Sequence, residues 1–121
     1  AAYNETDIFY LADSANTLNR VAFTEPQMDT TYLDADGAKL KSMRVKGFSA
    51  SDELINADFD PKTNEVSNFA KWRGIGDASS AGTWIFSEGQ FVLQKYDVDP
   101  TYDDQQNPIA VMKDGKIVLK P

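Results

Sequence analysis

The amino-acid sequence consists of short apolar runs, each ended after a few residues by glycine, proline, asparagine or aspartate. The runs are rich in aromatic and β-branched side chains, and helical periodicity is weak throughout the chain. This pattern is typical of β-strands joined by tight turns. The predicted strands are Ile8–Leu11, Leu18–Phe23, Leu40–Phe48, Val66–Arg73, Thr83–Phe86, Phe91–Val98, Ile109–Met112 and Ile117–Leu119. Their hairpin spacing predicts an antiparallel all-β fold, either a β-sandwich or an incomplete barrel or propeller-like sheet.

Turn residues predict where the chain reverses. Ser87–Gln90 and Lys113–Lys116 each contain a glycine between two apolar runs, and glycine adopts the positive φ of a tight hairpin turn without steric cost. Asp36-Gly37 and the segment from Asp60 to Asn64 predict two further turns. One short helix is predicted over Ser49–Asn56, where Ser51 is a suitable N-cap and acidic residues follow it.

Length and composition limit the classes of protein that fit. The 121 residues predict one domain, residues 1–121, and 41% apolar residues are enough for one hydrophobic core. The net charge of −7 argues against nucleic acid as a partner, because phosphate binding requires clustered Lys and Arg. The sequence has no apolar stretch long enough for a membrane span. Histidine and cysteine are absent, which excludes Ser-His-Asp and Cys-His catalysis, disulfides, and zinc sites built on those side chains.

Basic residues crowd one segment, Lys39 to Lys46, whereas the first 38 residues contain seven acidic side chains and one arginine. On a strand these basic side chains alternate between the two faces, so they predict a charged edge strand better than a binding patch. An edge strand leaves homodimerisation open as well.

Two aspartate-rich runs are candidate calcium sites, because Ca²⁺ takes six to eight oxygen ligands. The second run supplies the candidate metal ligands Asp97, Asp99, Asp103 and Asp104. The first run, from Asp58 to Glu65, is also good turn chemistry, and neither run has the glycine and glutamate of an EF-hand loop. Both a calcium-stabilised module and ordinary turns therefore remain open.

The segment from Lys71 to Trp84 contains three glycines between two predicted strands, with a tryptophan near each end. Tryptophan and arginine are enriched among the residues that anchor protein interfaces. The predicted partner-binding residues are Lys71, Trp72, Arg73, Asp77, Ser79 and Ser80. The alternative is a tight crossover whose tryptophans fill the core, and the alternation around Trp84 predicts that one of the two tryptophans is buried.

The same region resembles the exported bacterial family called domain of unknown function 1176. The resemblance rests on Phe59-Asp60-Pro61-Lys62-Thr63, Val66–Lys71, Arg73-Gly74-Ile75-Gly76-Asp77, Gly82–Phe86, Phe91-Val92-Leu93 and the earlier Leu18–Phe23 with Pro26. It covers residues 7–112 and mainly the C-terminal portion of longer members. Members usually have a cysteine where this chain has Ala78 and a second one within the segment corresponding to residues 99–104, so a disulfide that the resemblance implies is missing here.

The resemblance implies a periplasmic or secreted protein and no established activity. A weaker likeness, in the Phe-Asp-Pro turn, the glycine-rich loop and the Trp-x-Phe strand, is to inhibitors that protect bacteria against cell-wall hydrolases. We therefore expect an exported, non-catalytic binding module with a protein partner, an inhibitor or immunity-like protein that acts on a cell-wall hydrolase. The alternatives are a calcium-stabilised envelope module and a small hydrolase that uses paired carboxylates.

Overall fold

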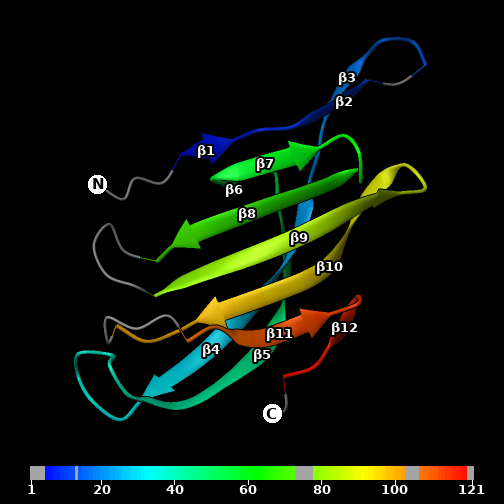
Figure 1. Cartoon of the computed structure of the whole chain (residues 1–121). Coiled ribbons are helices and arrows are strands. Elements are labelled where there is room, and N and C mark those ends of the chain that lie inside the picture. Colours follow the sequence, from blue (N-terminus) through cyan, green and yellow to red (C-terminus); the bar gives the residue numbers. More distant parts are fainter. Residues whose placement is uncertain (1–4, 13, 73–77, 103–106, 120–121) are drawn as a thin grey trace.

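The computed structural model describes residues 5–12, 14–72, 78–102 and 107–119, and every regular element among them is a β-strand (Figure 1). All strand pairings are antiparallel, and none of the sheets formed by the described strands closes into a barrel. The prediction of an antiparallel all-β fold is therefore confirmed. No helix in this part of the chain is long and apolar enough to cross a membrane.

A six-stranded sheet forms the larger layer, and its strands follow one another in chain order. They are β7 (Ala57–Asp60), β8 (Glu65–Lys71), β9 (Ser79–Ser87), β10 (Gln90–Asp99), β11 (Ile109–Lys113) and β12 (Lys116–Ile117). The two predicted hairpin turns are confirmed, since Glu88 and Gly89 have φ of 52° and 83°, and Asp114 and Gly115 have 52° and 76°. Two consecutive positive φ values match the twist of the flanking strands, so these turns fix the register of the meander.

A long hairpin of β4 (Phe23–Tyr32) and β5 (Leu40–Ser51) packs over part of this sheet. The indole Nε1 of Trp84 on β9 donates to the carbonyl of Thr24 on β4, at 2.8 Å, and so joins the two layers. β4 was not predicted from the sequence, because Pro26 interrupts it and polar residues dominate it. Among the described strands β4 pairs only with β5, so its other edge needs no donor from proline.

The N-terminal region adds two small two-stranded sheets. β1 (Thr6–Asp7) pairs with β6 (Leu54–Ile55), and β2 (Tyr10–Ala12) pairs with β3 (Leu18–Arg20) in a hairpin that projects from the body (Figure 1). The predicted helix over Ser49–Asn56 is wrong. Instead, β5 continues to Ser51, and the Ser51 Oγ accepts a hydrogen bond from the Glu53 N–H at 3.3 Å. The helix does not form because a short, weakly capped helix is less stable than the strand pairing on both sides of this segment.

The core lies between the long hairpin and the six-stranded sheet. Trp84 and Phe23 are its largest fully buried side chains, and their rings meet edge to face with centroids 5.4 Å apart. Such an arrangement is favourable beyond the area it buries. The other buried members of the cluster are Val21, Met43, Leu54, Val66, Leu93, Tyr96, Val98, Val111 and Met112. One of the two tryptophans is thus in the core, as the alternation around Trp84 predicted.

Candidate functional site

The predicted partner-binding residues are divided by the structure. Arg73 and Asp77 lie outside the described residues. Trp72 is partly exposed, and its backbone N–H donates to the Ala78 carbonyl at 3.0 Å next to the pair formed by Lys71 and Ser79. Lys71 and Trp72 therefore lie where β8 leaves the sheet and stay predicted binding residues.

Ser79 and Ser80 occupy a different environment. Both lie at the start of β9 and are buried, at 4% and 7% exposure. Ser80 forms a side-chain hydrogen bond with Tyr96 of β10 inside the molecule. Side chains this buried offer almost no surface to a partner, so they belong to the internal packing of β9 and β10.

The second aspartate run is only partly described, because Asp103 and Asp104 lie outside the described residues. Asp99 is buried, and its carboxylate accepts from the Asn107 N–H at 3.1 Å and, at longer range, from the Thr101 N–H and hydroxyl. Asp97 pairs with Lys95, with Oδ2 and Nζ 3.5 Å apart. Within residues 5–12, 14–72, 78–102 and 107–119, no three acidic side chains gather closely enough to hold a metal ion. Asp99 acts here as an organiser of its own loop.

The first aspartate run forms a turn. Oδ1 of Asp60 accepts from the Lys62 N–H at 2.9 Å, and Asn64 has a φ of 58°. Both features are those of the turn between β7 and β8, and Asn tolerates this left-handed conformation better than most residues. The turn alternative accounts for these residues.

An apolar groove that was not predicted from the sequence lies between the β2–β3 hairpin and the tip of the β9–β10 hairpin. Three adjoining depressions of about 200, 240 and 320 Å³ share Leu11 as a lining residue. We call them together the hairpin groove. Its apolar lining residues are Phe9, Tyr10, Leu11, Val21, Phe59, Phe86 and Phe91. Asn19, Arg20, Gly89 and Gln90 line its more polar parts.

The floor of the hairpin groove is continuous with the core. The Phe91 ring packs against Phe23 and Phe86, with centroids 5.4 and 5.2 Å apart, and Phe9 meets Phe23 edge to face at 5.5 Å. Aromatic rings fixed in this way lose little further freedom when a ligand binds, which favours affinity. Tyr10 and Phe59 are more open, with exposures of 54% and 41%, so the groove offers aromatic surface to a partner.

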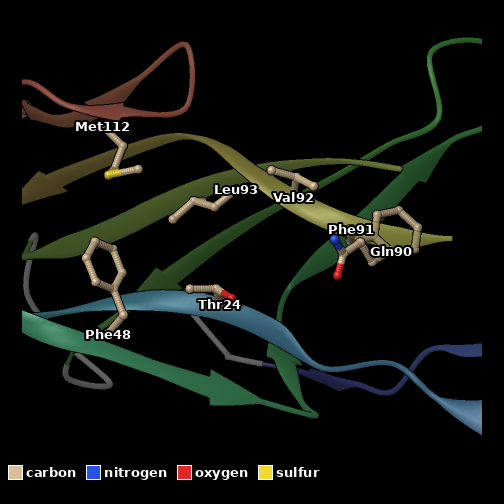
Figure 2. A pocket seen from close by; sticks show the side chains of 7 residues that line it. All are labelled: Thr24, Phe48, Gln90, Phe91, Val92, Leu93 and Met112. Atoms are coloured by element: carbon tan, nitrogen blue, oxygen red, sulfur yellow. The ribbon is translucent and has the colours of Figure 1, made fainter. Parts of the chain in front are cut away.

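A second cleft lies on the other side of Phe91, between the long hairpin and the six-stranded sheet. Figure 2 shows Phe48 of β5 rising toward Leu93 and Met112, with Thr24 beside them. This cleft encloses about 270 Å³. Phe91 and Gln90 line both it and the hairpin groove, so apolar surface extends along both sides of the start of β10.

Carboxylates predominate around the hairpin groove. Arg20 lines it, and its guanidinium pairs with Asp52 and Glu53, with Nε–Oδ2 and Nη2–Oε1 distances of 3.2 and 3.5 Å. Two carboxylates on one guanidinium leave a local negative charge. An apolar centre within a polar, charged rim is the usual anatomy of a protein interface.

Glu25 on β4 is half-buried between the layers, and this burial raises the pKa of its carboxyl above the ordinary glutamate value, partly opposed by a hydrogen bond with Ser51. The folded protein therefore binds this proton more tightly than the unfolded chain does. The contribution of Glu25 protonation to the stability of the fold is complete below pH 4.5, the ordinary pKa of a glutamate. This contribution is lost as the pH rises through the pKa of Glu25 in the folded state.

Glu25→Gln should accordingly make the protein more stable than the wild type at neutral pH, because the amide carries no charge to desolvate. Below pH 4.5 the two proteins should unfold at the same urea concentration, since both then carry an uncharged side chain. Urea unfolding at the two pH values measures the difference. An equal difference at both pH values would show that desolvation of the Glu25 charge is not its cause.

The sequence contains aromatic residues that indicate an exposed apolar site, but it does not show that they come together in the hairpin groove. Phe59, Phe86 and Phe91 lie next to turns, where aromatic side chains are less often covered on all sides than in mid-strand. These residues come from three different strands, and Phe9 and Leu11 come from the far N-terminal part. Only the packing of β2–β3 beside β9–β10 brings them together.

Comparison with known proteins relates the chain to a bacterial relative and to a family. The uncharacterized protein YpfG of Escherichia coli (strain K12) is 40% identical over 58 residues, which are 48% of this chain and 17% of the relative's length. No solved structure matches the chain. The model of the family DUF1176, described as a protein of unknown function, matches residues 1–108. The chain therefore belongs to the DUF1176 family.

Proposed function

We propose that this protein is a non-catalytic binding module that docks a partner protein in the hairpin groove. The observation that carries the proposal is an aromatic groove, anchored on the core through Phe23 and Phe91, that remains open between two hairpins. Interfaces concentrate their binding energy in a few such aromatic residues surrounded by polar ones.

The proposal includes an exported location, periplasmic or secreted, and a cell-wall hydrolase as the partner that the module inhibits. The family resemblance in the sequence supports this location. The net charge of −7 supports a basic partner, because opposite charges steer two proteins together and speed their association.

The two alternatives have less support. A calcium-stabilised module needs free carboxylate oxygens, whereas Asp97 is paired with Lys95 and Asp99 holds its own loop. A hydrolase needs a carboxylic acid in a water-poor cleft. Glu65 and Asp114 do line one depression, of about 350 Å³, but it lies on the outer face of the sheet and they share it with the cationic side chains of Lys95 and Lys113.

Two phenylalanine variants test the proposal. Phe59 and Phe69 have the same exposure, 41%, but Phe59 lines the hairpin groove and Phe69 does not line it. Binding to a purified basic lysozyme-type hydrolase is measured by surface plasmon resonance. We expect Phe59→Ala to raise Kd at least about tenfold, as the loss of an interface anchor does, and Phe69→Ala to leave Kd within about twofold.

Salt provides a second readout in the same experiment. The association rate should fall steeply with ionic strength if opposite charges steer the encounter.

Equal effects of Phe59→Ala and Phe69→Ala on Kd would show that the hydrolase does not bind in the groove. No measurable complex with the hydrolase would refute the proposed inhibitor role.

A further inference from the structure

We infer that the hairpin groove accepts an apolar side chain flanked by lysine or arginine, presented by a basic polypeptide segment. This inference rests on the proposed binding function and adds the chemistry of the bound segment. The apolar part follows from the lining: the depression formed by Phe9, Tyr10, Leu11, Val21, Phe59 and Phe91 has a volume of about 200 Å³, enough for one large side chain.

The cationic flanks follow from the charges next to that depression. Arg20 is held by Asp52 and Glu53, so this side of the groove carries one negative charge in excess. Glu88 is exposed in the β9–β10 turn, next to Gly89, which lines the groove. Glu88 and the cluster of Arg20, Asp52 and Glu53 therefore each present a net negative charge to a ligand.

The edge strand β7 adds no carboxylate to the wall of the groove. Asp58 and Asp60 are exposed, but they alternate with the groove residue Phe59 along the strand, so their side chains project to the opposite face. Beside the groove, three carboxylates therefore accompany one cationic side chain. The carboxylates are Asp52, Glu53 and Glu88, and the cation is Arg20.

Four of the twelve basic residues of the chain gather elsewhere. Lys41, Arg44 and Lys46 lie on β5, and Lys39 directly precedes it. The part of β5 that carries them lies at the opposite end of the molecule from the β2–β3 and β9–β10 hairpins (Figure 1). Because of this separation of charge, the end of the molecule that carries the groove attracts a basic partner and repels an acidic one.

Three synthetic peptides of equal length test the inference, each labelled for fluorescence anisotropy. One has a central phenylalanine flanked by lysines, the second has glutamates in place of the lysines, and the third keeps the lysines around a central alanine. At low salt we expect the lysine–phenylalanine peptide to bind with Kd below about 1 mM and the other two to bind at least about tenfold more weakly. The advantage over the glutamate peptide should shrink as salt screens the charges.

Two charge reversals supply the matched control. Glu88→Lys and Asp36→Lys change the net charge equally, but Asp36 lies in the turn between β4 and β5, away from the groove. We expect Glu88→Lys to weaken the lysine–phenylalanine peptide several-fold more than Asp36→Lys does. Equal binding of the lysine and glutamate peptides, equal effects of the two reversals, or no binding of the lysine–phenylalanine peptide would each overturn the inference.

The outcome separates this inference from the proposed function. If the hydrolase binds and Phe59→Ala weakens it while the peptides show no charge preference, the function stands and the inferred ligand chemistry is wrong. If the lysine–phenylalanine peptide binds through Phe59 but the hydrolase does not bind, the groove chemistry is right and the partner class is wrong.

Discussion

Trp84→Ala should lower the free energy of unfolding by about 3–5 kcal/mol, the usual cost of truncating a fully buried aromatic side chain. Trp84 has no exposed surface, packs edge to face on Phe23, and donates its indole N–H to the Thr24 carbonyl at 2.8 Å. Its loss removes a large part of the core and also the hydrogen bond that ties the β4–β5 hairpin to the sheet. Since domains of this size are stable by only about 5–15 kcal/mol, a substantial fraction of the variant should be unfolded in moderate urea.

Trp84→Phe keeps the measurement informative if the alanine variant fails to fold. Phenylalanine retains a ring against Phe23 but removes the outer ring of the indole and the part-buried hydrogen bond to the Thr24 carbonyl, a combined loss of about 1–3 kcal/mol. Trp72→Phe is the matched control, because Trp72 is partly exposed, and it should change stability by less than about 0.5 kcal/mol. Urea unfolding followed by far-UV circular dichroism gives all three values. Similar effects at Trp84 and Trp72 would contradict the described core.

Gly82→Ala should destabilise the protein by about 1–3 kcal/mol through overpacking. A Cβ at this position would lie 2.6 Å from Cη2 and 2.9 Å from Cζ3 of Trp84, and 3.1 Å from Cδ1 of Tyr96. The indole is fully buried and cannot move aside freely. The backbone is fixed as well, because the Gly82 N–H donates to the buried Asn68 side chain at 2.9 Å. The strand must therefore bend or the core must open.

Gly47→Ala is the control for this prediction. Gly47 also lies in a strand, but an added Cβ would meet nothing within 4 Å, so the change should be neutral or slightly stabilising. A double-mutant cycle identifies the clash. Cη2 and Cζ3 belong to the outer ring of the indole, which phenylalanine lacks, so Gly82→Ala should cost less in the Trp84→Phe background. Strict additivity would show that the outer ring is not what excludes a side chain at Gly82.

The fold was predictable where local chemistry decides it. The glycines of the β9–β10 and β11–β12 turns mark the two hairpins, and alternation around Trp84 marks its strand as half-buried. β4 was missed because its stability comes from pairing with β5 rather than from its own residues. The short helix was wrong for the same reason: Ser51 forms a local hydrogen bond to Glu53, but within a turn between two paired strands.

The sequence predicted that aromatic residues form the candidate site, but not which ones. Of the predicted binding residues, Lys71 and Trp72 lie at the end of β8, whereas Ser79 and Ser80 are buried at the start of β9. The alternation of apolar and polar residues along a strand does not show which face of the sheet is covered. The covered face depends on where the β4–β5 hairpin packs. The hairpin groove was missed because Phe9 and Phe91 are brought together by contacts between distant parts of the chain.

By itself, the sequence determined the all-β class, the two glycine turns, the acidic charge and the exclusion of histidine and cysteine chemistry. These properties depend on residue type and on neighbours within a few positions. The tertiary structure alone decided which tryptophan is buried, that Asp99 holds its own loop, and that aromatic residues from four strands and their connections meet beside a rim of carboxylates. The reason is physical: burial and charge environment are set by which strands pack together, and that packing is a property of the whole chain.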